Sequence, residues 1–507
     1  MLNEIYGPLK SGTDIRGTAV EGVEGEPVNL TDEALTAIGY GFAAWLYENV
    51  TPQYGELYTV AFGHDSRISA DRIKAAVLPT LLDCGINVKD CGLCSTPAMF
   101  MTTVDFECDA SIEITASHHP WNKNGLKFFI RKGGLEGSDI EAILTNAQYD
   151  IKPDLPEDMP KGTVTEVNYM TNYAKMLREK ICAEVNADDY ARPLRGFHIV
   201  VDAGNGVGGF YAEKVLEPLG ADVTGSQFLE PDGMFPNHIP NPENKVAMAA
   251  ISKAVLDNNA DLGVIFDTDV DRAACVAADG KEINRNALIA LASVIALEGN
   301  EGGTIVTDSV TSSGLKKFIE EDLGGKHHRF KRGYKNVINE SIRLNREECV
   351  NSPLAIETSG HAAMRENYFL DDGAYLMTKI IIKAAQMRKE DKPLDSLIEN
   401  LQQPIEAEEY RVKILDPDFK AYGMKVLEDF DAWLRSNEAY EVANDSFEGV
   451  RATKIEADGW MLLRLSVHDP ILPLNIETNK AGAISTILYD AKEFLSKYDQ
   501  LDISALG

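Results

Sequence analysis

The sequence of 507 residues predicts an α/β fold divided among several domains. Apolar runs with strand character alternate with segments whose apolar residues recur at helical spacing, an order typical of layered α/β proteins. Two acidic, proline-bearing stretches interrupt this order at residues 150–162 and 391–410 and indicate linkers. Because a chain of this length exceeds one hydrophobic core, we expect about three to five domains.

The N-terminal part contains repeated strand–helix units. Thr31, Ser69 and Ser95 each precede a helical pattern and are predicted to cap it through their hydroxyl groups. Strands are predicted over residues 57–62 and 86–89, each before one of the two later helices. The first helix has its apolar positions at Leu35, Ile38, Phe42 and Trp45.

A polar loop lies between two predicted strands, Ala110–Ile114 and residues 125–130. Ser117 follows the first strand, two histidines come next, and Lys127 lies at the start of the second strand. A hydroxyl, two proton carriers and a cation on a loop held at both ends are suited to phosphoryl or acyl transfer. The alternative is a turn that satisfies only its own backbone, and these residues alone leave both interpretations open.

A glycine pattern follows the predicted strand at residues 197–202. Residues 204–209 read GNGVGG and match G-x-G-x-x-G, which is typical of dinucleotide binding after a strand. However, Asp202 and Ala203 separate the strand from the glycines, and no acidic residue clearly ends a second strand at the usual distance. We therefore favour a structural turn over nicotinamide binding.

Three carboxylates follow the predicted strand at residues 261–266. In extended chain Asp267, Asp269 and Asp271 would point the same way, which makes an oxygen-rich site for a hard cation such as Mg²⁺. The segment is not an EF-hand, because Arg272 occupies the position of the obligatory glycine. The alternative is an acidic surface turn, and we favour the metal site.

A third strand–helix unit begins at residues 304–307. Further on, Glu357, Ser359 and His361 end a strand, and alternation would place them on one side, where they suit the hydroxyl groups of a sugar. A Ser–His hydrolase site is not favoured because the sequence lacks a nucleophile elbow. An apolar helix over residues 374–387 comes next.

The C-terminal part is predicted to contain two helices and a central strand over residues 459–465. Arg464 and Ser466, at the end of this strand, could hold one phosphate group. A plain exit from strand to loop explains the same residues, and both interpretations stay open.

The net charge of −31 argues against partners that require a basic face, so we expect neither nucleic acid nor an anionic membrane. An anionic substrate would be repelled at long range, so a phosphate site must be built from locally clustered Arg and Lys. Two basic turns qualify: residues 12–17, which carry Arg16, and residues 331–335, which read KRGYK.

The cysteines and the N-terminal residues predict a cytoplasmic protein. Seven cysteines in a chain this long do not form a disulfide framework. The start lacks a basic segment followed by an apolar stretch, and no apolar run approaches a membrane-spanning length, so we expect no signal peptide and no membrane span. Cys91 and Cys94 form a lone CxxC, for which incidental cysteines are favoured over a metal or redox role.

Taken together, these motifs resemble the α-D-phosphohexomutase family over nearly the whole chain. Residues 115–120 (TASHHP) with 124–127 (NGLK) resemble its phosphoserine loop, usually T-A-S-H-N-P followed by N-G-x-K. Residues 267–272 (DTDVDR) resemble its magnesium loop, D-G-D-G-D-R, and residues 357–361 (ETSGH) its sugar-binding loop, E-x-S-G-H. Supporting matches lie at residues 12–17, 202–206, 235–238 and 240–242.

The resemblance implies four domains around a central cleft: three related mixed α/β sandwich domains and a smaller α+β C-terminal domain. We place them at residues 1–160, 161–298, 299–403 and 404–507. They would carry, in order, the phosphoserine loop, the metal-binding loop, the sugar-binding loop and a phosphate-binding loop.

The resemblance also implies the chemistry. The enzyme would be a phosphohexomutase, an isomerase that interconverts hexose 1-phosphate and hexose 6-phosphate through a phosphoserine and a hexose 1,6-bisphosphate. The implied catalytic residues are Ser117, His118, Lys127, Arg16 and His361. The implied substrate-binding residues are Arg272, Gly333, Lys335, Glu357, Ser359, Arg464 and Ser466. The implied ligands of Mg²⁺ are Ser117, through its phosphoryl oxygen, with Asp267, Asp269 and Asp271.

Three departures from the family pattern stand out. His119 replaces the usual Asn after Ser-His. Thr268 and Val270 replace glycines of the magnesium loop, so we expect a backbone restricted to negative φ there. In the fourth domain the family commonly offers R-x-S-x-T-x-P, whereas residues 464–470 read RLSVHDP. Val467 and Asp469 are poor phosphate partners, although His468 could compensate when protonated.

We therefore expect a cytoplasmic, Mg²⁺-dependent phosphomannomutase or phosphoglucomutase with a hexose 1,6-bisphosphate as activator. The substrate would be a small phosphosugar, with no nucleic acid or membrane partner, and the enzyme a monomer or homodimer. A phosphoglucosamine mutase is the alternative within the same class. A non-catalytic sugar-phosphate-binding homologue is the alternative from another class.

Overall fold

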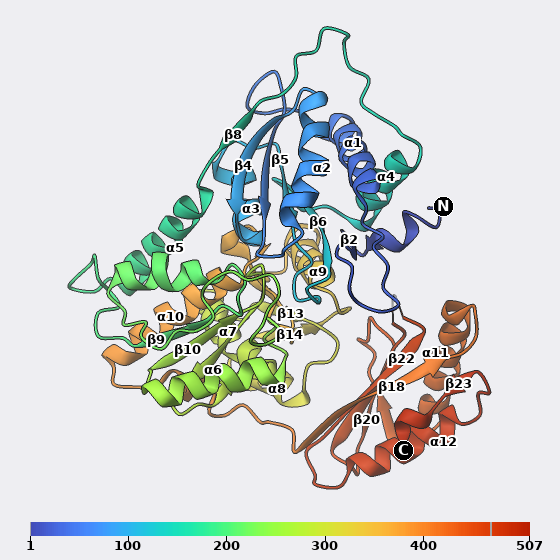
Figure 1. Ribbon diagram of the computed structural model, residues 1–507. Helices are drawn as coiled ribbons and strands as arrows, with labels where there is room; N and C mark the ends of the chain where they lie inside the picture. The colour runs from blue at the N-terminus through green and yellow to red at the C-terminus, as the bar shows by residue number, and fades with distance from the viewer. Residues whose placement is uncertain (1, 467–468) are drawn as a thin grey trace. The chain divides into compact units, whose positions relative to one another are not determined.

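The computed structural model describes residues 2–466 and 469–507 (Figure 1). The chain forms two compact units. The first comprises Met1–Leu288 and Ser359–Ser396, and the second comprises Ile289–Thr358 and Leu397–Gly507. Helix α7 (Asn286–Leu297) contains the first point at which the chain passes from one unit to the other. The boundaries of the four predicted domains stay a prediction.

The N-terminal sheet of the first unit has the strand order β1-β2-β6-β5-β3-β4-β8, with β7 paired to β6. Strand β3 runs parallel to β4 and β5, whereas β6 runs antiparallel to β5 and β2. The strands are β1 (Lys10–Ser11), β2 (Asp14–Thr18), β3 (Thr59–His64), β4 (Asn87–Leu93), β5 (Ala110–Ile114), β6 (Lys123–Ile130), β7 (Gly133–Gly134) and β8 (Val164–Glu166). The predicted strands are confirmed with shifted ends, and β6 includes two residues that the sequence placed in the loop.

Helices α1 (Asp32–Asn49), α2 (Ala70–Asp83) and α4 (Gly137–Gln148) pack on this sheet through one apolar core. Phe42 of α1 stacks on Phe128 of β6 with ring centroids 4.8 Å apart. Because the apolar side chains of the helices recur at helical spacing, each helix buries one face against the strands. Helix α3 (Thr96–Asp105) follows β4 and is buried along almost its whole length.

The structure confirms two of the three helix caps that the sequence predicts. Thr31 accepts a hydrogen bond from Ala34 N, and Ser95 accepts one from Ala98 N, so both predictions are confirmed. The prediction for Ser69 is wrong, because its side chain makes no capping hydrogen bond. Its Oγ accepts instead from Asn124 Nδ2 (2.9 Å), and this bond ties the start of α2 to β6.

A second sheet of the first unit has the order β12-β11-β10-β9, with β9 and β10 parallel. Its strands are β9 (Ile199–Asp202), β10 (Leu262–Phe266), β11 (Ala273–Ala277) and β12 (Glu282–Ile283). Helices α5 (Tyr169–Val185), α6 (Lys245–Asn258) and α10 (Gly373–Lys389) and the antiparallel pair β16 (Ala362–Met364) and β17 (Leu370–Asp371) complete this unit. The apolar helix predicted at residues 374–387 is thus confirmed as α10.

The second unit contains a parallel group of strands and a C-terminal sheet. The parallel strands are β13 (Thr304–Thr307), β14 (Lys326–Arg329) and β15 (Leu354–Ile356), accompanied by α8 (Ser313–Lys317) and α9 (Tyr334–Glu347). The C-terminal strand order is β19-β20-β21-β22-β18-β23. These strands are β18 (Glu406–Ile414), β19 (Tyr440–Val442), β20 (Val450–Lys454), β21 (Gly459–Leu463), β22 (Ile471–Thr478) and β23 (Leu501–Asp502).

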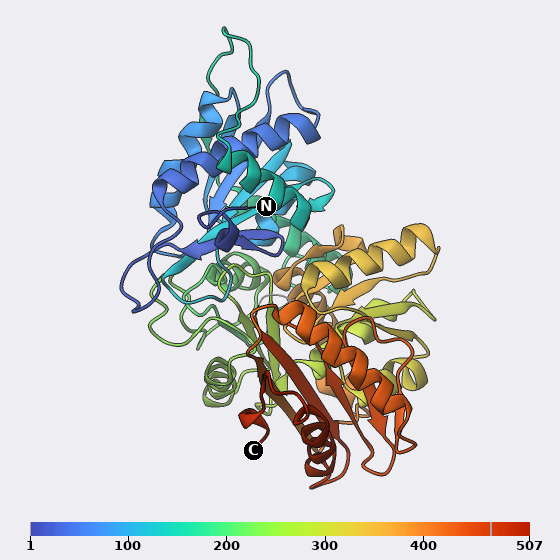
Figure 2. The same cartoon turned by 90° about the vertical axis from the view of Figure 1, so that its right-hand side faces the viewer.

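Helices α11 (Phe419–Arg435) and α12 (Ile484–Leu495) pack on the C-terminal sheet (Figures 1 and 2). Phe430 of α11 and Phe494 of α12 lie 5.1 Å apart within the core that the helices share with the strands. The two predicted helices and the predicted central strand, which is β21, are therefore confirmed.

The predictions about the cysteines and about membrane-spanning segments can be compared with the structure over the described residues. All seven cysteines lie there and are free, as expected from their number. Within these residues, no helix combines the length and apolar character that crossing a membrane requires.

A buried imidazolium joins the glycine turn after β9 to the next loop. His238 Nε2 lies 3.0 Å from both carboxylate oxygens of Asp202, and its Nδ1 lies 3.0 Å from the carbonyl oxygen of Ile239. A carbonyl and a carboxylate only accept, so both ring nitrogens donate and the ring carries a charge. Burial opposes this charge, but the hydrogen bond and charge of Asp202 outweigh it and raise the pKa of His238.

We expect His238→Gln to destabilise the protein most in acid. Because the folded-state pKa is raised, the stabilisation is fully present below the unfolded value of about 6.5 and is lost as the pH rises through the folded pKa. A hydrogen bond to a charged group contributes about 2 kcal/mol. The melting temperature of the variant should therefore lie below that of wild type in acid, with a gap that narrows as the pH rises. His198→Gln, at a half-buried histidine, is the control. A difference in melting temperature between His238→Gln and wild type that does not change with pH would contradict the assignment of a charged His238 ring.

Candidate active site

Ser117 lies in a left-handed backbone conformation just after β5. Its φ is 51°, which residues other than glycine rarely adopt, and the residue is buried. Its Oγ donates a hydrogen bond to Asp267 Oδ2 (3.0 Å), and His118 Nδ1 lies 3.3 Å from the same Oγ. The predicted nucleophile therefore contacts one of the predicted metal ligands directly.

The three carboxylates of residues 267–271 lie together, but for a different reason than alternation along a strand. Strand β10 ends at Phe266 and a turn follows, within which one oxygen each of Asp267, Asp269 and Asp271 lies within 4.8 Å of the others. The prediction of negative φ is wrong at Val270, whose φ is 67°. A β-branched residue in this conformation is strained, and the strain persists because Val270 is fully buried and its carbonyl accepts from Gly373 N (3.1 Å).

Asp269 and Asp271 each have one oxygen that is suited to bind a cation, while the other oxygen already accepts hydrogen bonds. Asp269 Oδ2 accepts from Thr96 Oγ1 (2.5 Å) and Lys127 Nζ (2.9 Å), and Asp271 Oδ2 accepts from Lys127 Nζ (2.5 Å). The Oδ1 atom of each carboxylate is buried and has no hydrogen-bond partner. Leaving a buried carboxylate oxygen without a partner costs free energy, and a hard divalent cation with oxygen ligands removes that cost. The donor set therefore fits Mg²⁺.

The electrostatics of the cluster require a positive partner as well. Burial, together with the charges of Asp271 and Asp269, raises the pKa of Asp267 well above its ordinary value. Burial acts in the same direction on Asp271, but Lys127 and Arg272 outweigh it and lower the pKa of that carboxyl. Lys127 thus offsets the negative charge of Asp271 more than that of Asp267.

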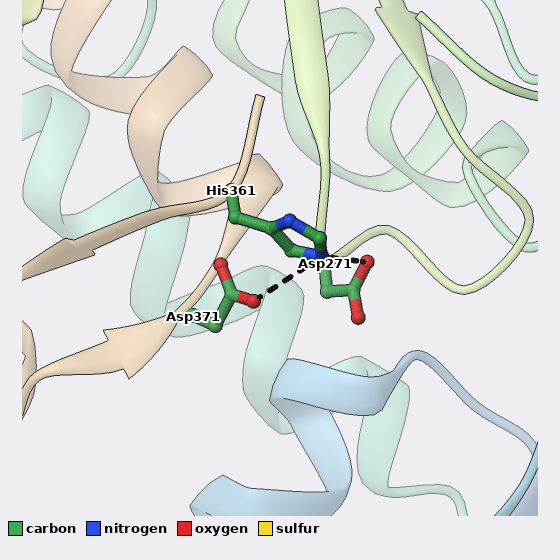
Figure 3. Close-up of side chains that lie close together, drawn as sticks. All are labelled: Asp271, His361 and Asp371. Carbon is green, nitrogen blue, oxygen red and sulfur yellow. Dashed lines mark ion pairs between the residues drawn. The ribbon is translucent and has the colours of Figure 1, made fainter. Parts of the chain in front are cut away.

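His361 lies in a second buried cluster with Asp271 and Asp371 (Figure 3). Its Nε2 lies 3.6 Å from a carboxylate oxygen of each, and it accepts from Arg272 Nε (3.1 Å). Since Nε2 accepts, Nδ1 carries the proton and donates to Ser359 Oγ (2.9 Å). His361 thus contacts two residues that were predicted to bind the substrate, Ser359 and Arg272.

The histidines of the site are neutral rather than poised near neutral pH. Burial, with Arg272 and His119, lowers the pKa of His118, and burial with Arg272 and Lys127 lowers that of His361 well below its ordinary value. A histidine that carries protons in catalysis usually has a pKa near the working pH, and neither ring has one. Each ring is therefore in its neutral form and not in the imidazolium form.

Arg16 extends from β2, where its register partner is Gly125 of β6. Its Nη2 donates to Asp14 Oδ2 (2.7 Å), and its charge contributes to the lowered pKa values of His118 and His361. The structure therefore brings Arg16, Lys127 and Arg272 into one electrostatic environment with His118 and His361.

The second unit contains the other predicted substrate ligands. Gly333 N donates to Glu357 Oε1 (2.7 Å), and Lys335 lies in the first turn of α9. The predicted alternation of Glu357, Ser359 and His361 along a strand is wrong, because β15 ends at Ile356 and residues 357–360 do not continue it.

Arg464 of the second unit pairs with a carboxylate that the sequence did not indicate. Its Nη1 lies 3.6 Å from Glu448 Oε1, while Glu448 Oε2 accepts from Ser309 Oγ (2.6 Å) and Arg332 N (3.0 Å). Nearby, Ser466 Oγ accepts from Asp469 N (3.2 Å). The predictions for Val467 and His468 fall outside the described residues.

The glycine pattern of residues 204–209 packs closely against its surroundings. A Cβ at Gly206 would meet the backbone of Thr268, and one at Gly209 would meet the carbonyl oxygen of Leu229. These glycines permit backbone approach beside the metal loop, which agrees with the favoured interpretation as a structural turn.

Layered α/β architecture with a hydroxyl, a lysine and a carboxylate cluster that could hold a metal ion at one site is typical of phosphoryl-transfer enzymes. The chain belongs to the phosphoglucomutase/phosphomannomutase family. Models of its three alpha/beta/alpha domains, I, II and III, match residues 10–151, 171–280 and 284–405. With the additional C-terminal sheet, the predicted family and fold class are confirmed.

Several relatives are similar over most of their length. A phosphoglucomutase of Neisseria gonorrhoeae is 30% identical over 472 residues, which cover 92% of this chain and 93% of the relative. A phosphomannomutase/phosphoglucomutase of Pseudomonas aeruginosa is 28% identical, with 95% of each chain covered. A family protein of Burkholderia thailandensis has a solved structure with a TM-score of 0.77 at 24% identity, covering 98% of both chains, and supports the fold.

Proposed function

We propose that this enzyme interconverts hexose 1-phosphate and hexose 6-phosphate, with mannose or glucose as the hexose, through a phosphoserine at Ser117. One observation carries the proposal. The buried Ser117 Oγ lies 3.0 Å from Asp267, within a cluster in which Asp269 and Asp271 each leave one buried oxygen without a hydrogen-bond partner. The family membership and the names of the relatives support the same activity.

In this proposal the phosphoryl group of Ser117 passes to the free hydroxyl of a bound hexose phosphate. The P–Oγ bond breaks as the bond from phosphorus to the sugar oxygen forms, and the sugar proton passes to a base. His118 and His361 are the two proposed bases. Nδ1 of His118 lies 3.3 Å from Ser117 Oγ, whereas Nε2 of His361 must first give up the hydrogen bond that it accepts from Arg272 Nε. The resulting hexose 1,6-bisphosphate then returns its other phosphoryl group to Ser117.

The carboxylates Asp267, Asp269 and Asp271, with a phosphoryl oxygen on Ser117, would hold Mg²⁺. When bound, this ion offsets negative charge on the transferring group. Lys127, which already donates to two of these carboxylates, adds positive charge, and Arg16 and Arg272 add more. Lys127 and Arg272 are buried and Arg16 is half-buried, and this locally clustered positive charge lets an anionic substrate bind despite the net charge of −31.

The substrate ligands proposed for the sugar and its second phosphate are Arg272, Gly333, Lys335, Glu357, Ser359, Arg464 and Ser466. A carboxylate and a hydroxyl can each accept from or donate to ring hydroxyls, so either orientation of the sugar can be bound. We propose a cytoplasmic monomer or homodimer that is activated by hexose 1,6-bisphosphate.

A coupled assay with glucose 1-phosphate, mannose 1-phosphate and glucosamine 1-phosphate tests the proposal. We expect turnover with glucose or mannose phosphate that stops on chelation and returns with Mg²⁺. Turnover with the glucosamine phosphate alone would favour a phosphoglucosamine mutase. Binding of all three without turnover, and without any uptake of a phosphoryl group, would favour a non-catalytic sugar-phosphate-binding protein, the alternative motivated by the divergent residues 464–470.

We expect Arg464→Ala to raise KM more than it lowers kcat. A guanidinium contact to the phosphate that is not transferred would be present in both the ground state and the transition state. A hydrogen bond to a charged group contributes about 2 kcal/mol, which corresponds to roughly a 30-fold rise in KM. Steady-state kinetics measure it, and unchanged KM would show that Arg464 does not bind the substrate.

Glu448→Gln is expected to lower KM. The carboxylate faces Arg464 at 3.6 Å and competes with a phosphate for that guanidinium, whereas an amide keeps an acceptor for Ser309 and Arg332 N without the charge. Asp469→Asn, an equal change of charge at an exposed position, is the control and should be neutral or mildly helpful. A higher KM in Glu448→Gln would instead mean that Glu448 positions Arg464 for the phosphate.

A further inference from the structure

The turn after β3 carries a buried arginine that the proposed mechanism does not use. The side chain of Arg67 is 0% exposed. Its Nε donates to Asp65 Oδ2 (3.2 Å), its Nη1 to the carbonyl oxygens of Pro120 (2.7 Å) and Lys123 (2.9 Å), and its Nη2 to those of His119 (2.6 Å) and Ser117. A guanidinium has five N–H groups, so this contact set satisfies all of them.

Four of these five acceptors belong to the backbone of one loop, residues 117–123, which carries Ser117. The carbonyl groups of the loop point towards the guanidinium and accept its hydrogen bonds. These bonds offset the free energy that burial of the charged group would otherwise cost. The guanidinium also lies over the ring of Phe235, with its carbon 5.3 Å from the ring centroid. Arg67 therefore has a fixed position from which it holds the loop.

A second chain of hydrogen bonds reaches Ser117 at its backbone N–H group, whereas Arg67 binds its carbonyl group. Asp65 accepts from Arg67 N (2.9 Å) and, through Oδ2, from Thr115 Oγ1 (2.7 Å). Thr115 Oγ1 in turn accepts from the N–H of Ser117 (2.8 Å). Both the N–H and the carbonyl group of Ser117 are thus held by one network that is centred on Asp65 and Arg67.

We propose that Arg67 is a positioning residue that holds Ser117 in its left-handed conformation and so directs Oγ towards the metal-binding carboxylates. The inference rests on the proposed function. A serine at φ 51° is strained, and strain of this kind persists only where the surroundings fix the backbone. With its carbonyl group released, Ser117 relaxes to a negative φ, and Oγ moves away from Asp267.

Lysine does not replace arginine in this role. It keeps the positive charge, but its three N–H donors lie on one atom and do not reach carbonyl groups arranged around a planar fork. Misplacement of a reacting group by about 1 Å can slow a reaction on the order of 100-fold. We therefore expect Arg67→Lys to slow transfer of a phosphoryl group to Ser117 on the order of 100-fold, while KM stays within about 3-fold of wild type.

The test is a single-turnover reaction of the full-length enzyme with glucose 1,6-bisphosphate and Mg²⁺, followed by intact mass. Wild type is compared with Arg67→Lys, with Thr115→Val and with Arg72→Lys. Arg72 is the matched control, because it too donates to carbonyl oxygens, those of Ala19 (2.9 Å) and Leu30 (3.0 Å), but in another segment. We expect slow transfer in the first two variants, wild-type transfer in the control, and Mn²⁺ affinity unchanged in all of them.

The possible failures are distinguishable. No phosphoryl uptake by wild type would overturn the proposed function itself. Uptake by wild type with equal rates in Arg67→Lys and Thr115→Val would overturn the role of Arg67. A fall in Mn²⁺ affinity parallel to the fall in rate would also overturn it, because a loss of general structural support affects the carboxylates as well. Should Arg67→Lys not fold, Thr115→Val decides, with transfer expected to be at least about 10-fold slower than in wild type.

Discussion

Replacing Ser117 with alanine should abolish turnover while leaving the affinity for hexose phosphate nearly intact. The variant removes the only atom of this residue that can carry a phosphoryl group, and water does not replace a nucleophile that must keep that group. We expect kcat to fall by at least about 1,000-fold. The remaining substrate ligands are unchanged, so binding measured by calorimetry should differ little from wild type.

Ser111→Ala is the matched control for this experiment. Ser111 lies on β5, the strand that leads to Ser117, and its Oγ is buried without a hydrogen-bond partner. Its loss removes a buried serine hydroxyl from the same region without touching the reaction. Comparable activity losses in Ser111→Ala and Ser117→Ala would show that the effect comes from disturbed packing rather than from the nucleophile.

Replacing Asp269 with asparagine should cripple turnover, because it removes a proposed metal ligand. The side chain keeps its shape, and an oxygen in the place of Oδ2 can still accept from Thr96 and Lys127, but the atom in the place of Oδ1 becomes an amide nitrogen that does not bind a cation. Since loss of groups that merely support a metal ligand costs about 10- to 100-fold in affinity, we expect at least about a 100-fold loss here. Mn²⁺ titration and activity after chelation and addition of Mg²⁺ measure the two effects.

Asp279→Asn is the control for charge, because Asp279 is an exposed carboxylate in the turn after β11. It should leave metal affinity and turnover at wild-type values. Wild-type Mn²⁺ affinity in Asp269→Asn, or tight Ca²⁺ binding that the substitution does not weaken, would contradict the magnesium assignment.

Much of the fold and of the chemical centre could be predicted because the relevant residues lie close together in the sequence. Periodicity located the strands that lead to the candidate site, among them β5, β6 and β10, with ends shifted by at most a few residues. The proposed nucleophile and carboxylates lie in two contiguous loops, at residues 115–127 and 267–272. What contiguous sequence does not specify is backbone conformation. Val270 adopts a positive φ against its own preference, because burial and a hydrogen bond from Gly373 over-determine it.

The supporting residues escaped prediction because their partners are distant in the chain. Arg67 binds carbonyl oxygens, which every residue has and which leave no trace in the sequence. Thr96 fixes Asp269 from the start of a helix in which its residue type indicates only a helix terminus. Glu448, which faces Arg464, lies in an acidic stretch of an acidic chain. Basic residues at the exits of strands, such as Arg67 after β3, were the one available signal.

The most direct measurement of the central claim is the location of the phosphoryl group. The enzyme is incubated with a hexose 1,6-bisphosphate and Mg²⁺, its intact mass is measured, and the modified residue is identified by fragmentation. We expect one added phosphoryl group, on Ser117, that is lost when hexose 1-phosphate or hexose 6-phosphate is added. An unmodified chain, or a stable phosphoryl group on any other residue, would contradict it.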